Sequence, residues 1–142
     1  MPQGAYKMAS NRYLVAVLCA VGFGIAAPAF AQSYYCTLKE TGRRTGWISP
    51  DMYVHIAADA REIVVEDAVM QHFGTQSVNA KVGDITASGI LFRWSVDTRA
   101  GNQWARIEYR ATLSQDSMKI RVQAKPTGYS NEFEARGTCK KV

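Results

Sequence analysis

The sequence contains few of the residues on which most enzymes and metalloproteins depend. Its 142 residues include three cysteines and two histidines, His55 and His72. Neither histidine has a cysteine, a second histidine or an acidic residue at the spacing of a metal site, so we expect no bound metal. No Cys-x-x-Cys pair occurs, and no serine lies in a Gly-x-Ser-x-Gly turn. We therefore expect that the protein is not an enzyme and that it has no catalytic residues and no cofactor.

A long run of basic residues is also absent, which argues against binding to nucleic acid. The formal net charge of the whole chain is +5. Residues 32–142 hold 15 lysines and arginines against 12 aspartates and glutamates, which gives a net charge of +3. This mild positive charge is compatible with an acidic partner or an anionic surface. We expect no nucleic-acid partner.

A long apolar run lies at the N-terminus and is typical of a secretory signal peptide. Lys7 and Arg12 precede an unbroken apolar run over residues 14–25. Small residues follow and end in Ala29-Phe30-Ala31, which is an Ala-x-Ala cleavage signal. The sequence therefore predicts cleavage between Ala31 and Gln32.

This signal predicts how the chain is divided. Residues 1–31 form the expected signal peptide, and residues 32–142 form one mature domain that is periplasmic or secreted. An uncleaved anchor over residues 14–31 would be at the short limit for crossing a bilayer. Because Pro28 and the small residues around it fit a cleavage site better, we expect a mature protein that does not span the membrane.

Two cysteines remain beyond the expected signal peptide, near the two ends of the mature chain. In the oxidising environment of an exported protein, Cys36 and Cys139 are expected to form a disulfide. In the chain-entropy description, closing a loop of this length stabilises a fold by about 4–5 kcal/mol. A redox-active pair is the alternative, but it usually has Cys-x-x-Cys spacing, so a structural crosslink is favoured.

Apolar and polar residues alternate along most of residues 32–142, which is the pattern of half-buried antiparallel strands. The clearest alternation covers residues 90–96, 105–113 and 118–124. Turn-forming Pro, Gly, Asn and Asp residues separate the segments. We expect an all-β fold, a single-domain antiparallel β-barrel or β-sandwich of about eight strands. Residues 67–74 are assigned either to a loop or to one helical turn.

The positions of the cysteines suggest how such a fold closes. Cys36 and Cys139 both lie in the apolar phase of their segments, so their side chains are expected to point inward. In a closed barrel the first and last strands are neighbours, and the disulfide would join the N- and C-terminal strands. A sandwich with adjacent terminal strands satisfies the same pattern, so the sequence leaves barrel and sandwich open.

The polar phase of the later segments carries a group of cations. If these segments form a meander, five cations share one outer surface with only Glu108 between them, and a tryptophan is in phase with them. The six candidate binding residues are Arg93, Trp104, Arg106, Arg110, Lys119 and Arg121. Such a surface could bind an acidic protein or an anionic envelope component through arginine contacts. A solvated sheet face, on which charge prevents aggregation, is the alternative.

The apolar phase carries large aromatic side chains, which are expected to point inward. They are Phe92, Trp94, Tyr109 and Phe133. Such side chains either fill a core or line a pocket for an apolar small molecule, as in lipocalin-like carriers. We therefore expect an exported noncatalytic binding protein of the cell envelope, with a small carrier of an apolar ligand as the alternative.

A further alternative depends on Tyr34-Tyr35-Cys36 near the expected mature start and on the late Cys139. In a small exported β-barrel this combination resembles the bacterial periplasmic inhibitors of C-type lysozyme, which implies a periplasmic inhibitor of a secreted enzyme. The Ser-Gly-x-x-Tyr inhibitory loop of that family has no counterpart, because Ser88-Gly89 is followed by Ile90-Leu91-Phe92. Those inhibitors bind a basic enzyme, whereas this chain is itself basic. No functional residue is carried over.

Overall fold

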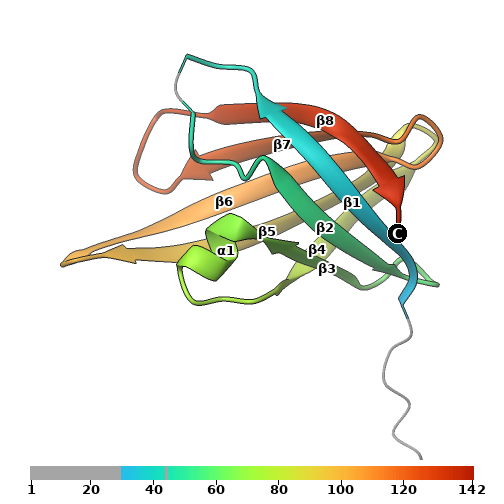
Figure 1. Ribbon diagram of the computed structural model, residues 1–142, viewed down its shortest axis with the longest axis horizontal. Helices are drawn as coiled ribbons and strands as arrows, with labels where there is room; N and C mark the ends of the chain where they lie inside the picture. The colour runs from blue at the N-terminus through green and yellow to red at the C-terminus, as the bar shows by residue number, and fades with distance from the viewer. Residues whose placement is uncertain (1–29, 44) are drawn as a thin grey trace, which may run out of the picture.

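Eight antiparallel strands form a closed barrel in the order in which they follow one another along the chain (Figure 1). The computed structural model describes residues 30–43 and 45–142. The elements are β1 (Phe30–Glu40), β2 (Asp51–Ala57), β3 (Ile63–Asp67), α1 (Ala68–His72), β4 (Val78–Thr86), β5 (Gly89–Ala100), β6 (Gln103–Ser114), β7 (Lys119–Pro126) and β8 (Phe133–Lys141). The predicted all-β fold of about eight strands is confirmed, and the closed ladder decides for the barrel over the sandwich.

Strand β8 closes the barrel by pairing with β1. Cys36 lies directly opposite Cys139 in this ladder, and the two form a disulfide across a sequence separation of 103. The predicted crosslink between the first and last strands is therefore confirmed. A disulfide of this kind indicates that the protein matures in an oxidising, extracytoplasmic setting.

The expected signal peptide lies almost entirely outside the described residues. Of residues 1–31 only Phe30 and Ala31 are described, and they belong to the start of β1. Phe30 pairs with β2, the register then shifts, and the regular ladder begins at Gln32. Cleavage after Ala31 would therefore leave the regular part of β1 intact.

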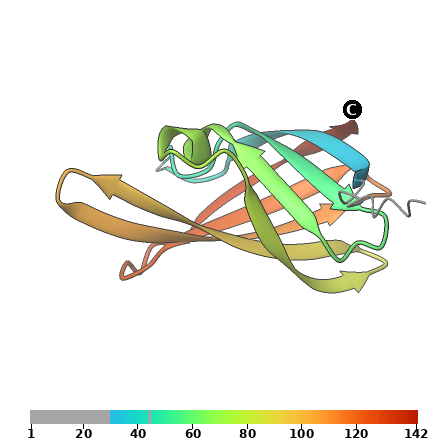
Figure 2. The same cartoon turned by 90° about the horizontal axis from the view of Figure 1, so that it is seen from below.

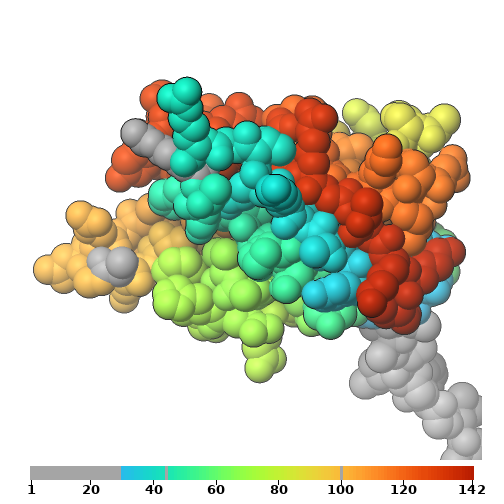
Figure 3. Space-filling view, turned by 45° about the horizontal axis from the view of Figure 1, so that its top comes forward, coloured from blue at the N-terminus to red at the C-terminus, as the bar shows by residue number. Residues whose placement is uncertain are grey.

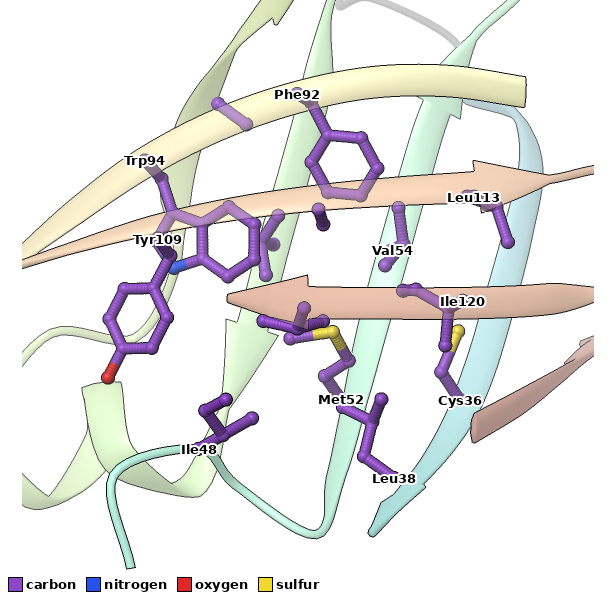
Figure 4. Packing of buried hydrophobic residues seen from close by; sticks show 14 of the residues in the cluster. Cys36, Leu38, Ile48, Met52, Val54, Phe92, Trp94, Tyr109, Leu113 and Ile120 are labelled. Atoms are coloured by element: carbon purple, nitrogen blue, oxygen red, sulfur yellow. The ribbon is translucent and has the colours of Figure 1, made fainter. Parts of the chain in front are cut away.

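The apolar phase of the strands fills the interior of the barrel (Figure 4). Large side chains that are fully buried include Tyr34, Met52, Ile63, Met70, Phe92 and Leu113. Phe92, Trp94 and Tyr109 stack in a row, with ring centroids 5.7 Å and 5.2 Å apart. The aromatic side chains that were predicted to point inward thus pack against one another and against aliphatic neighbours, as in a closely packed core.

Strands β5 and β6 project beyond the barrel as a long hairpin (Figures 1 and 2). The two strands pair with each other along their whole length. In contrast, β4 pairs with β5 only as far as Arg93, and β7 pairs with β6 only from Ile107. Residues 94–106, which we call the hairpin tip, therefore extend past the pairings with β4 and β7, although Trp94 and Val96 at its base are still buried in the core.

The segment between β3 and β4, which the sequence left open between a loop and a helical turn, contains α1. The side chain of Asp67 caps this helix by accepting a hydrogen bond from the backbone N–H of Met70 at 2.8 Å. At the other end, the N–H of Phe73 donates to the carbonyl groups of Val69 and Met70. Helix α1 lies at the end of the barrel from which the hairpin projects (Figure 1). Within the described ranges, no helix has the length and apolar character needed to cross a membrane.

Candidate functional site

The structure places all six predicted binding residues on the outside of β5, β6 and β7. Their side chains are exposed, and Trp104 has 61% of its surface accessible. Arg93 lies on β5, Trp104, Arg106 and Arg110 on β6, and Lys119 and Arg121 on β7. We call the five cations among them the basic face. Its role in binding remains a prediction.

Two members of the basic face have a carboxylate partner within the sheet. Arg106 donates to Asp97 directly across the hairpin, with Nε 2.8 Å from Oδ1. The guanidinium of Arg106 also lies 5.9 Å from the centroid of the Trp104 ring. Arg121 donates to Glu134 on β8. These hydrogen bonds hold the pKa values of Asp97 and Glu134 below the ordinary carboxyl range, so both pairs remain charged at neutral pH.

Two other members of the basic face lie in a row of cations. Lys81 on β4 is opposite Arg93 on β5, and Arg93 is opposite Arg110 on β6. Within residues 30–43 and 45–142, no carboxylate forms an ion pair with any of these three side chains. Like charges at directly opposite strand positions repel one another and lower stability. These three cations, which we call the basic row, are therefore a surface that an anionic group would stabilise.

The basic row lies in the more basic part of the chain. Residues 78–142 carry 11 lysines and arginines against 6 acidic residues, whereas residues 32–77 carry 4 against 6. A depression of about 200 Å³ beside the row is lined by Arg93, Arg110 and Lys125 and also by Glu108 and Glu132. Glu108 thus interrupts the basic face where the sequence predicted an interruption.

An apolar groove lies at the end of the barrel from which the hairpin projects, and the sequence did not predict it. Its volume is about 290 Å³, and it is bounded by the inner side of the hairpin tip, by α1, and by the loops before β2 and after β7. Its apolar lining includes Trp47, Val69, Phe73, Ile107, Pro126 and Tyr129. We call this feature the mouth groove. Figure 3 shows the hairpin tip extending past α1 on this side of the molecule.

Hydrogen bonds fix the loop that carries Trp47 into the mouth groove. Oε1 of Glu40 accepts from the backbone N–H groups of Trp47 at 3.0 Å and of Ile48 at 2.6 Å. The hydroxyl of Tyr109 donates to the carbonyl of Trp47 at 2.8 Å, and burial raises the pKa of Tyr109, so the donor is retained at neutral pH. The Trp47 ring stacks on Phe133 with 5.2 Å between ring centroids. This wall of the groove is therefore formed before any partner binds.

The opposite wall of the mouth groove is formed by α1, which Asp67 caps. Replacing Asp67 by Asn is expected to maintain or raise the stability of the protein at neutral pH. The Asp67 side chain is buried, and burial raises its pKa. Because the folded-state pKa lies above the unfolded value, the folded state binds this proton more tightly, and stability falls as pH rises through the raised pKa. Asn retains the cap without the charge. In urea unfolding, the advantage of Asp67→Asn should be largest at about pH 7 and should shrink towards about pH 4.

The control for this prediction is Asp67→Ala, which removes the acceptor for the N–H of Met70. Loss of an N-cap costs about 1–2 kcal/mol, so this variant should be less stable than the native protein at every pH. If Asp67→Asn is less stable than the native protein at neutral pH, the prediction is wrong and the charge itself stabilises α1.

A serine, a histidine and an acid meet on the outer face of β1, β2 and β3. Oγ of Ser33 lies 2.8 Å from Nδ1 of His55, and Nε2 of His55 lies 3.9 Å from Oε1 of Glu66. The second distance is too long for a hydrogen bond. A serine hydrolase also needs free N–H groups for the developing oxyanion, whereas these residues lie in regular paired strands. This arrangement therefore gives no support to catalysis.

Metal ligands do not gather in the described part of the chain, where no three His, Cys, Asp or Glu side chains are placed to hold an ion.

Comparison with known proteins adds no relative. No family model, no curated protein and no solved structure matches this chain. The two surface features that could bind a partner are therefore the basic row and the mouth groove.

Proposed function

We propose that this protein is a noncatalytic binding protein of the cell envelope that holds an acidic partner protein against its basic face. The basic row is the observation that carries the proposal. Lys81, Arg93 and Arg110 repel one another across three strands, and no described carboxylate forms an ion pair with any of them. Carboxylates of a partner would relieve this repulsion, and arginine can bind them with two parallel hydrogen bonds.

The proposed location is the periplasm or the cell exterior, after removal of residues 1–31. The basic start and the apolar run of the N-terminal segment support this location. The disulfide supports it independently, because such bonds persist in oxidising compartments. The regular β1 ladder begins at Gln32, so a chain that starts there retains the seam with β8.

An apolar small molecule is the second candidate ligand, and the mouth groove is the observation that favours it. Side chains fill the barrel interior, so the proposed site for such a molecule is the groove rather than the interior. Apolar binding is not weakened by salt in the way that binding between charges is. The salt dependence of binding therefore separates the two candidates.

Reversing the charge of two arginines in the basic row is expected to weaken binding to an acidic polypeptide about tenfold. Each exposed charge contact contributes about 0.2–1 kcal/mol, and Arg93→Glu with Arg110→Glu replaces two attractions by repulsions. Fluorescence anisotropy of labelled poly-L-glutamate would measure binding to the disulfide-bonded protein recovered after export. The affinity of the native protein should fall as salt rises.

The matched control is Arg43→Glu with Lys141→Glu, which makes the same change in net charge away from the basic row. Both residues are exposed, one in the loop after β1 and one at the end of β8. This control should retain most of the affinity. If both double variants lose the same affinity for poly-L-glutamate, net charge alone explains the effect and the proposal is overturned. Tighter binding to phosphatidylglycerol vesicles than to polyglutamate would show that the partner is an anionic membrane surface and not an acidic protein.

A further inference from the structure

The hairpin tip leaves one edge of β5 without a partner strand. Strand β4 pairs with β5 as far as Arg93 and pairs with β3 at its other end. From Ser95 to Arg99, β5 therefore has a neighbour on the β6 side only, among the residues that the structure describes. The side chains of Ser95, Asp97 and Arg99 are exposed. Figure 2 shows the hairpin extending past β4 at this end of the barrel.

The backbone groups along this edge point away from the hairpin. The N–H of Thr127 donates to the carbonyl of Arg106 at 2.7 Å, so the backbone groups of Arg106 face β7. In an antiparallel ladder these groups alternate sides at each residue, and Arg106 lies opposite Asp97. Asp97 therefore directs its N–H and C=O away from β6. Ser95 and Arg99, two residues to either side, do the same.

An apolar surface and a cationic surface flank this free edge. On the inner side, Thr98 and Ala105 of the hairpin tip line the mouth groove together with Phe73. On the outer side, Arg93 and Arg99 are exposed and form no ion pair with another described residue, while Asp97 between them is paired with Arg106. Successive side chains of a strand point to opposite faces. A strand laid along this edge would therefore direct alternate side chains to the groove and to the arginines.

We propose that the free edge of β5 binds an extended segment of the acidic partner by strand addition. The backbone of the segment pairs with Ser95, Asp97 and Arg99, its apolar side chains enter the mouth groove, and its acidic side chains face Arg93 and Arg99. In this mode of recognition, main-chain hydrogen bonds provide affinity and alternate side chains provide specificity. The inference rests on the proposed function and adds to it the conformation of the partner and its alternating acidic and apolar sequence.

The test uses the synthetic peptide (Glu-Val)4 and the variant Ser95→Pro. Proline removes the outward N–H of residue 95 and is tolerated at strand edges, because no ladder bond to β6 is lost. Ser95→Pro should bind the peptide at least tenfold more weakly than the native protein, whereas Ser95→Ala, which retains the N–H, should bind it equally well. In amide hydrogen exchange, the N–H groups of Ser95, Asp97 and Arg99 should become protected when the peptide is added to the native protein. This second measurement does not depend on the folding of the proline variant.

Strand addition and the proposed function fail in different ways. Peptide binding that is weakened by Arg93→Glu with Arg110→Glu, but that leaves the three edge amides unprotected, would overturn strand addition and retain the acidic partner. Protection of the edge amides by (Glu-Val)4 and equally by (Lys-Val)4 would support the edge as a binding site and overturn the acidic partner. A native dimer that Ser95→Pro converts to monomers, with no peptide binding, would assign the edge to a second copy of this chain and overturn the proposal.

Discussion

Loss of the crosslink between Cys36 and Cys139 is expected to lower the free energy of unfolding by about 4–5 kcal/mol. The bond spans a sequence separation of 103, so it closes most of the chain into one loop and restricts the unfolded state. Domains of this size are usually stabilised by only about 5–15 kcal/mol, so the expected loss is a large share of the total. Urea unfolding of the native protein and of Cys36→Ala with Cys139→Ala would measure it.

The control is the native protein after reduction of the disulfide. Both cysteines are buried, so alanine leaves small cavities that add their own cost to the double variant. The reduced native protein lacks the crosslink but retains the sulfur atoms, and it isolates the contribution of the bond. A free energy of unfolding that is almost the same before and after reduction would contradict the expected effect.

Adding one methyl group at Gly137 is expected to lower the free energy of unfolding by at least about 3 kcal/mol. Gly137 lies in β8 opposite Leu38 of β1 and Ile120 of β7. A Cβ atom at this position would be 1.8 Å from the carbonyl oxygen of Thr37. Because the obstructing atom belongs to the backbone of β1, Gly137→Ala can be accommodated only if the seam between β1 and β8 moves apart. Urea unfolding monitored by tryptophan fluorescence would give the loss.

The matched substitution is Gly101→Ala at the end of the hairpin. Gly101 has a φ of +61°, but among the described residues, its two chain neighbours aside, no atom lies within 4 Å of a Cβ built there. The expected cost is therefore only the conformational preference of glycine, about 1 kcal/mol. If the two variants lose equal stability, the close approach of the strands at Gly137 does not constrain the barrel.

Strand alternation could be predicted from the sequence because it depends on one strand at a time. Tyr34, Phe92 and Val122 lie in the apolar phase of their segments and are fully buried. Closure could not be decided in this way, because inward-pointing cysteines fit a sandwich with adjacent terminal strands as well as a barrel. The decision required the full set of strand pairings, in which every strand has two neighbours and β8 closes onto β1.

Which charged residues are neighbours on the surface depends on the register between strands, and a single sequence does not show that register. The sequence placed Arg93 and Arg110 on one face but did not reveal that Lys81 is opposite Arg93. It also did not reveal that Asp97 is opposite Arg106 and pairs with it. The mouth groove was missed for a different reason. Trp47 and Tyr129 lie in loops, where side chains follow no period that would indicate a shared surface.

The disulfide at the seam also changes what a protease can do to this molecule. Because Cys36 and Cys139 are linked, the chain between them is a covalent ring. One cut in any loop of that ring, including the turn at the end of the hairpin, opens the ring without releasing a fragment. The two pieces stay joined through the sulfur atoms, and the eight strands keep their neighbours. The nicked protein should therefore migrate as a single chain on a denaturing gel until a reductant separates it into two.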